Sequence, residues 1–186
     1  MRQIEGGINA AKGFQAAGVE AGVKYHNRRD MALVYSTAPC VAAGTFTTNV
    51  VKAAPVMWDM EVVDKSSFVQ AAVVNTGMAN SATGRQGMDC CRREAECAGR
   101  LLGIPADAVL IASTGVIGVQ LPEDRIMKGI EKLAEAKSEG RDAARDAAMA
   151  IMTTDTHPKE IAVEMTIGGK IVTLGGMCKG SGMIHP

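Results

Sequence analysis

Val109-Leu110-Ile111-Ala112-Ser113-Thr114-Gly115-Val116-Ile117-Gly118 is the most informative stretch of this 186-residue chain. Its first residues form a short apolar run, which is typical of a buried strand. The run continues directly into a small loop with a Ser, a Thr and two glycines. Polar loops on a rigid scaffold often carry binding or catalytic residues. We therefore expect a buried strand here, with a candidate site where it ends.

Further helices and strands are predicted on both sides of this strand. Apolar residues that recur every three or four positions indicate amphipathic helices over residues 86–102, from Pro122 onward and over residues 142–152. Short β-branched or apolar runs predict strands over residues 31–36, 41–48, 69–75, 160–167 and 170–175. Gly168-Gly169 is typical of a hairpin turn, whereas residues 13–22 have an irregular pattern. The order predicts an α/β fold, a mixed sheet with layered helices, in a single domain over residues 1–186.

The composition argues against several classes of protein. Twenty basic residues balance twenty acidic ones, so the chain lacks the basic excess that nucleic acid or an anionic membrane would attract. Aromatic residues make up only 3%, too few for a platform that stacks bases. The chain shows no apolar signal region and no run of 18 apolar residues. We therefore expect a cytoplasmic protein without nucleic-acid or membrane partners.

The cysteines favour neither a disulfide scaffold nor a metal site. Their number is odd, two of them are adjacent, and no C-x-x-C spacing occurs among Cys40, Cys90, Cys91, Cys97 and Cys178. This pattern fits a reducing compartment, and the cysteines of the helix are expected to pack in the core. Zinc would require paired Cys or His at short spacing, so we expect no metal.

Three polar segments that contain glycine follow predicted strands, at residues 75–84, 113–115 and 175–182. The last segment places Lys179 beside Gly180 and Ser181. It does not fit a phosphate-binding P-loop, because the order Gly-Lys-Ser/Thr is not met. No cofactor is expected from these loops, and each of their glycines can also serve simply as a turn residue.

Several segments in order resemble the ornithine acetyltransferase (glutamate N-acetyltransferase) family of arginine biosynthesis. The matching segments are residues 13–18, 42–49 with 52–56, 74–84 with 86–87, 112–118, 152–156 and 175–186. Thr76 and Met78 depart from the Ser and Asn more common in this family, and Ser81-Ala82 varies the end of the same loop. The resemblance covers almost the whole chain, which makes it far more specific than any one glycine-rich loop.

The resemblance implies a self-processing enzyme with a fold of the N-terminal-nucleophile type. Such enzymes cut their own backbone before a Thr or Ser, and the freed amine then activates the hydroxyl. The glycine-rich loop before Pro186 is followed by no further element, which is expected if this chain is the α subunit of such a precursor. The β subunit would begin with the nucleophilic Thr, beyond Pro186, and the family suggests a heterotetramer of two α and two β chains.

The family reaction moves an acetyl group from N-acetylornithine to glutamate through an acetyl-Thr intermediate, and some members also accept acetyl-CoA as a co-substrate. By resemblance, Thr114 and Gly115 form the oxyanion hole, and the absence of a Cβ at Gly115 admits the substrate. Lys179 matches a substrate-binding lysine, whose cation suits an amino-acid carboxylate. Thr153 or Thr154 matches a further substrate contact.

Two other interpretations remain open. A self-processing amidase or aminopeptidase of related fold would use water in place of glutamate as the acceptor. A non-enzymatic α/β domain that binds a small molecule would fold and purify alone. The enzyme interpretation instead expects a second chain, because a sheet that ends after residues 170–175 would leave an apolar edge to be covered.

Overall fold

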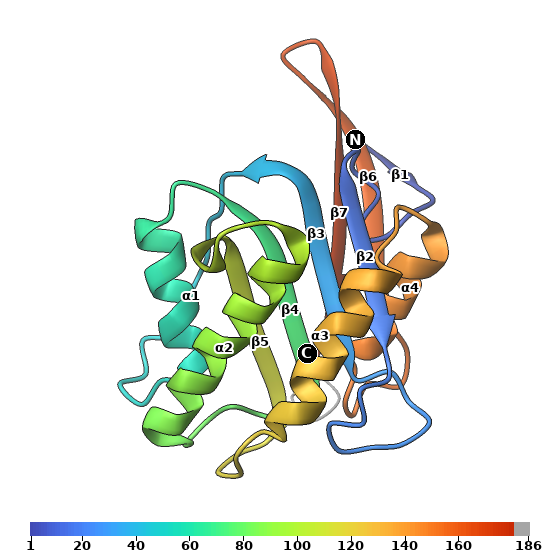
Figure 1. The fold of residues 1–186 in the computed structure, drawn as a ribbon. Coiled ribbons are helices and arrows are strands. Elements are labelled where there is room, and N and C mark those ends of the chain that lie inside the picture. The colour runs from blue at the N-terminus through green and yellow to red at the C-terminus, as the bar shows by residue number, and fades with distance from the viewer. Residues whose placement is uncertain (181–186) are drawn as a thin grey trace.

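The computed structural model describes residues 1–180 (Figure 1). Its elements are β1 (Arg2–Ile4), β2 (Phe14–Val19), β3 (Met31–Cys40), α1 (Ala54–Lys65), β4 (Val69–Met78), α2 (Gly84–Leu102), the 3-10 helix η1 (Ala106–Ala108), β5 (Val109–Val116), α3 (Glu123–Ala136), α4 (Arg141–Ala150), β6 (Lys159–Ile167) and β7 (Lys170–Cys178). The predicted α/β class is therefore confirmed. None of the helices in this part of the chain is long and apolar enough to cross a membrane.

The strands form two sheets and not the single mixed sheet that the sequence predicts. One sheet has the order β2-β3-β4-β5, with β4 and β5 parallel and the other neighbours antiparallel. The other sheet is antiparallel, with the order β1-β6-β7. The hairpin of β6 and β7 turns at Gly168 and Gly169, whose φ angles are 57° and 78°, and its tip projects beyond the rest of the molecule (Figure 1).

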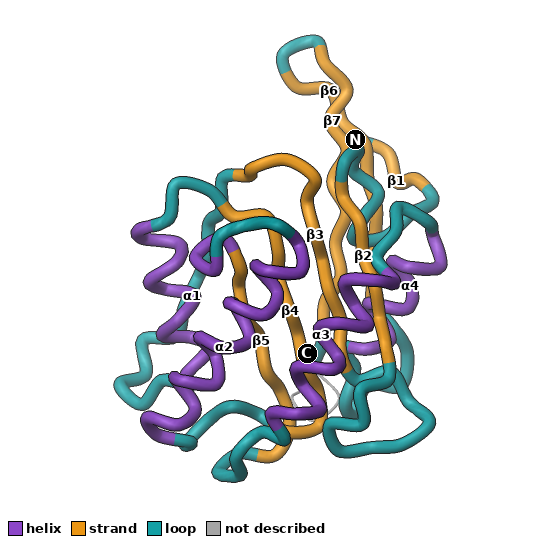
Figure 2. Tube along the Cα trace, viewed as in Figure 1, coloured by secondary structure: helices purple, strands orange, loops and turns teal. Residues whose placement is uncertain are grey.

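The helices of residues 1–180 cover the four-stranded sheet on one face and, on the other face, only the part formed by β2 and β3. Side chains alternate along a strand, so residues paired across the sheet share a face. Ala17, Leu33, Val73 and Ile111 are paired in this way and are buried under α1, α2 and α3, which lie side by side in Figure 2. On the other face, small residues of β2 and β3 pack against α4.

Gly18 explains how closely α4 approaches β2. A Cβ at Gly18 would lie 2.1 Å from the carbonyl oxygen of Asp146 in α4, closer than any carbon and oxygen that are not bonded can come. Only glycine therefore permits this helix–strand contact. Of the glycines that make residues 13–22 appear irregular in the sequence, Gly18 thus belongs to the regular strand β2, whereas Gly13 and Gly22 lie outside it.

Helix α1 closes the outer edge of β5, and the sequence does not predict it. The indole N–H of Trp58 donates to the carbonyl oxygen of Val109 at 2.9 Å, and the carboxylate of Asp59 accepts the N–H of Ile111 at 2.8 Å. These side chains satisfy backbone groups that an edge strand leaves unpaired. The helix begins with Pro55 in its first turn, a position that suits proline.

One predicted strand is wrong. Residues 41–48 form no strand, whereas β3 continues through Pro39 as far as Cys40. The reason is the neighbouring strand: Cys40 pairs with Val69, the first residue of β4, so the residues after Cys40 have no strand to pair with. The remaining predicted helices and strands are confirmed, with ends that differ by a few residues.

Candidate functional site

The proposed oxyanion residues lie at the carboxyl end of β5. Thr114 and Gly115 pair with Thr76 and Gly77 of the parallel strand β4. Gly115 has φ = 141°, and a Cβ there would lie 2.3 Å from the carbonyl carbon of Gly77. Glycine is thus required for the contact between the two strands. The sequence interpretation gave a different reason, the admission of substrate, and the structure adds this packing requirement.

The loop after β4 is held by buried polar side chains. The amide of Asn80 donates to the carbonyl oxygen of Gly87 at 2.9 Å, while its oxygen accepts the hydroxyl of Thr83 at 2.6 Å. Ser113 accepts the backbone N–H of Asn80 and donates to the carbonyl oxygen of Met78. This network connects the ends of β4 and β5, so it stabilises the backbone on which Thr114 and Gly115 lie.

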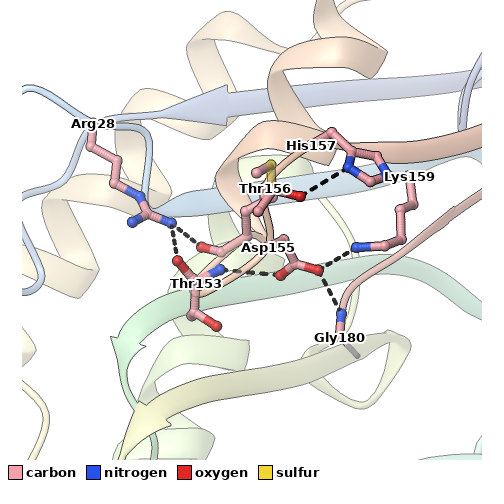
Figure 3. Close-up of polar contacts among 8 residues, drawn as sticks. Arg28, Thr153, Asp155, Thr156, His157, Lys159 and Gly180 are labelled. Atoms are coloured by element: carbon pink, nitrogen blue, oxygen red, sulfur yellow. Dashed lines mark hydrogen bonds and ion pairs between the residues drawn. The ribbon is translucent and has the colours of Figure 1, made fainter. Parts of the chain in front are cut away.

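Thr76 connects this strand end to the segment that carries Thr153 and Thr154. Its hydroxyl lies 3.1 Å from the carbonyl oxygen of Ala150 at the end of α4, and its backbone N–H donates to Asp30. From the loop between β2 and β3, Arg28 donates to the carbonyl oxygens of Met152 and Thr153 (Figure 3). Thr153 is half-buried and Thr154 is exposed.

The segment with Thr153 is tied to the end of β7 by Asp155. One carboxylate oxygen of Asp155 accepts the backbone N–H of Gly180 at 3.0 Å and the ammonium of Lys159 at 2.5 Å. The other oxygen accepts the N–H of Thr153 at 3.4 Å (Figure 3). Lys179, which is exposed, directly precedes Gly180. The structure therefore brings together two segments that the sequence assigns to substrate binding.

These contacts also determine the charge of Asp155. The pKa of Asp155 is lowered to about 2, with the hydrogen bond from Lys159 as the largest cause; burial opposes this shift, and the N–H groups of Gly180 and Thr153 contribute to it. The carboxylate is therefore ionised at any pH near neutrality. Sequence reasoning missed Asp155, Lys159 and Arg28, although Asp155 lies inside the segment 152–156 that carries the family resemblance.

Within residues 1–180 there is no group of three or more His, Cys, Asp or Glu side chains that could hold a metal ion. The predicted loop at residues 175–182 is described only as far as Gly180. Its last two residues, and the rest of the resembling segment to Pro186, lie outside the described residues.

Known protein families and solved structures show which proteins this chain resembles. The ArgJ family model matches residues 15–186. The chain belongs to the ArgJ family. Among relatives, the arginine biosynthesis bifunctional protein ArgJ of Gloeobacter violaceus is 49% identical, over 98% of this chain and 45% of the relative. The protein of the same name from Thermotoga neapolitana is 50% identical, over 94% of this chain and 43% of the relative. The chain thus spans less than half the length of these ArgJ relatives.

Crystal structures of ArgJ proteins share the fold. The structure of ArgJ from Bacillus halodurans matches with a TM-score of 0.93 and 38% identity, over 100% of this chain and 96% of that chain. Ornithine acetyltransferase from Mycobacterium tuberculosis, crystallised in complex with ornithine, matches with a TM-score of 0.90 and 38% identity, over 100% and 97%. The predicted fold of the N-terminal-nucleophile type is thereby confirmed.

Proposed function

We propose that this chain is the α subunit of a self-processed acetyltransferase that moves the acetyl group of N-acetylornithine to glutamate. One observation carries the proposal. Thr114 and Gly115 lie at the carboxyl end of β5, in a chain whose fold matches an ornithine acetyltransferase crystallised with ornithine. An acyl-transfer reaction needs donors at a fixed place for the oxyanion of its transition state, and a strand end held by neighbouring strands meets that need.

The reaction has two balanced halves. The amine of the amino-terminal Thr of the β subunit takes the hydroxyl proton, and the oxygen attacks the acetyl carbonyl of N-acetylornithine. The C–N bond then breaks, and ornithine leaves with the proton on its amine. In the second half, the amine of glutamate attacks the carbonyl of the acetyl-Thr ester, and the ester C–O bond breaks to give N-acetylglutamate. The proton that the glutamate nitrogen loses passes through the amine of the Thr to its oxygen, which restores the hydroxyl.

This chain would supply binding and electrostatic groups to both halves. The hydroxyl of Thr114 and the backbone N–H of Gly115 donate to the oxyanion, a contribution of roughly 3–4 kcal/mol for a single donor in other enzymes. Lys179 binds the carboxylate of the amino-acid substrate as a cation. A hydroxyl of Thr153 or Thr154 contacts the same substrate. No resident cofactor takes part, and acetyl-CoA is a possible alternative donor.

The partner would be a β subunit cut from the same precursor, in a heterotetramer of two α and two β chains in the cytoplasm. Two observations support a second chain. The match to this chain covers 96% of the ArgJ chain solved from Bacillus halodurans but only 45% of the ArgJ relative from Gloeobacter violaceus. This difference in coverage is expected if ArgJ is divided into two chains. The hairpin of β6 and β7 also exposes apolar side chains, with Ile171 exposed by 74% and Leu174 by 57%. Exposed apolar surface of this kind often marks a protein interface.

An intact mass spectrum of the natively purified protein, with and without N-acetylornithine, tests the proposal. We expect a second chain that begins with Thr and gains one acetyl group. Addition of glutamate should then remove the acetyl group much faster than water does. Faster loss to water would indicate an amidase or aminopeptidase. A single chain without an adduct would contradict the proposal and favour a non-enzymatic binding domain.

A further inference from the structure

Asp155 occupies a position that the family reaction does not explain. It belongs to the same segment as Thr153, and its carboxylate accepts the backbone N–H of Thr153 and that of Gly180, which lies 25 residues further along the chain. Thr153 is in the first segment, and Gly180 follows Lys179 in the second. Neither bond involves a side chain of the proposed substrate residues, so Asp155 acts on their backbone.

The carboxylate is buried at a cost that its contacts must offset. The side chain of Asp155 is 1% exposed, and the ammonium of Lys159 is its ion-pair partner. A buried charge is tolerated only when it is paired and hydrogen-bonded. Here three donors converge on two oxygens, and two of the three are backbone groups of the proposed substrate segments.

Lys159 extends this connection to the hairpin. It is the first residue of β6 and pairs with Cys178, the last residue of β7. The ammonium of Lys159 and the N–H of Gly180 therefore reach the same carboxylate oxygen from paired ends of two strands. Lys179 and Gly180 follow the end of β7, and the backbone N–H of Gly180 is bonded to Asp155.

We propose that Asp155 is a positioning residue for substrate binding: it holds the backbone at Gly180 so that Lys179 faces the segment of Thr153 and Thr154. This inference rests on the proposed function, because it assumes that these residues bind an amino-acid substrate. Gly180 has φ = 127°, a conformation open mainly to glycine, and a glycine without an anchor samples many conformations. Loss of the anchor would therefore spread the ammonium of Lys179 over many positions.

The expected effect is on substrate affinity more than on the chemical step. A hydrogen bond to a charged group contributes enough to change an equilibrium by about tenfold or more. We expect Asp155→Ala to raise the KM for N-acetylornithine and for glutamate by about tenfold, with kcat changed by less than about threefold. Asp155→Asn keeps an amide oxygen that can accept the N–H of Gly180, so its KM should lie between those of Asp155→Ala and the wild type.

The test uses the full-length protein with any second chain that it carries. Asp146→Asn is the matched control, because Asp146 forms an ion pair with Arg29 at the surface and bonds to neither substrate segment. Two quantities are measured for each variant. The first is the pair of KM and kcat values. The second is the rate of amide hydrogen exchange in a peptide that contains Gly180, which reports the anchor without catalysis.

The expected result is a raised KM and faster exchange at Gly180 in Asp155→Ala, a smaller rise in Asp155→Asn, and neither change in Asp146→Asn. An unchanged KM in both Asp155 variants, with only a lower melting temperature, would overturn the inference. So would equal exchange at Gly180 in all variants. If the wild type transfers no acetyl group from N-acetylornithine to glutamate, the proposed function fails, and the exchange rates alone then decide whether Asp155 holds this loop.

Discussion

Glu94 should make this protein less stable as the pH rises from 5 to 8. The sequence pattern places it among the charged residues of α2, yet it is only 1% exposed. Its hydrogen-bond partner is the thiol of Cys90, at 3.4 Å. Burial is the largest cause that raises the pKa of Glu94 to about 7; the bond from Cys90 opposes this rise, and the charge of Glu123 adds to it.

The direction of this pH effect on stability follows from proton binding. Because the folded pKa is above the unfolded one, the folded protein holds this proton at a pH where the unfolded chain has released it. The Glu94 carboxyl therefore does not lower the free energy of unfolding below pH 4.5, and it lowers that free energy increasingly up to pH 7. With a pKa of 4.5 unfolded and about 7 folded, the loss of stability between pH 5 and 8 is about 2–3 kcal/mol.

Urea unfolding of the wild type and of Glu94→Gln at pH 5 and pH 8 measures this effect. Glutamine has nearly the same shape and keeps an oxygen for the thiol of Cys90, but it cannot ionise. The free energy of unfolding of Glu94→Gln, relative to that of the wild type, should rise by about 2–3 kcal/mol between pH 5 and 8. Other buried carboxyls, such as Asp59, whose pKa burial raises to about 7, are common to both proteins and cancel in this difference.

The control is Glu96→Gln, an exposed glutamate two residues further along the same helix, which should show the same pH dependence as the wild type. Equal pH dependence in Glu94→Gln and the wild type would refute the reasoning. It would mean that Glu94 has a partner or water that stabilises its charge.

Three further predictions concern the site and the core. Thr114→Ala should lower the rate of acetyl transfer by about 10²–10³-fold in single-turnover assays, and an unchanged rate would exclude Thr114 as an oxyanion donor. Lys179→Ala should raise the KM for the amino-acid substrates by about tenfold, whereas an effect on kcat alone would point to another role. Gly18→Ala should lower the free energy of unfolding by about 1–3 kcal/mol or more, because its Cβ would overlap the backbone of α4. Gly140→Ala, where a Cβ would meet nothing closer than 3.5 Å, is the control in the same urea titration.

The elements that sequence reasoning predicted correctly depend on local patterns. The apolar run at residues 109–113 contains enough information to define a strand, and the periodicity of residues 86–102 defines an amphipathic helix. The strand is less buried than the run predicts, because β5 lies at the edge of its sheet and Ala112 is exposed. The glycines at 168 and 169 predict their turn in the same way, because both adopt positive φ. Periodicity did not predict the burial of Glu94, because α2 packs against the sheet and also against α1 and α3.

For the candidate site, the sequence motifs identified Thr114, Gly115, Thr153, Thr154 and Lys179 by resemblance, and these assignments stay predictions. The structure adds how they are held. Thr76 connects β4 to the end of α4, and Asp155 connects the segment of Thr153 to Gly180. No local pattern distinguishes Asp155 from a surface aspartate, because its partners include a residue 25 positions away.

The sequence by itself determined the family, the α/β class and most of the helices and strands, because periodicity, turn residues and motifs are properties of neighbouring residues. Only the tertiary structure decided that residues 14–19 form a strand while residues 41–48 do not, and that the strands divide into two sheets. It alone also showed that Asp155 joins the two segments for which we propose substrate binding. These findings share one physical reason. A strand needs a partner strand and a buried charge needs hydrogen-bond donors, and both kinds of partner come from distant parts of the chain.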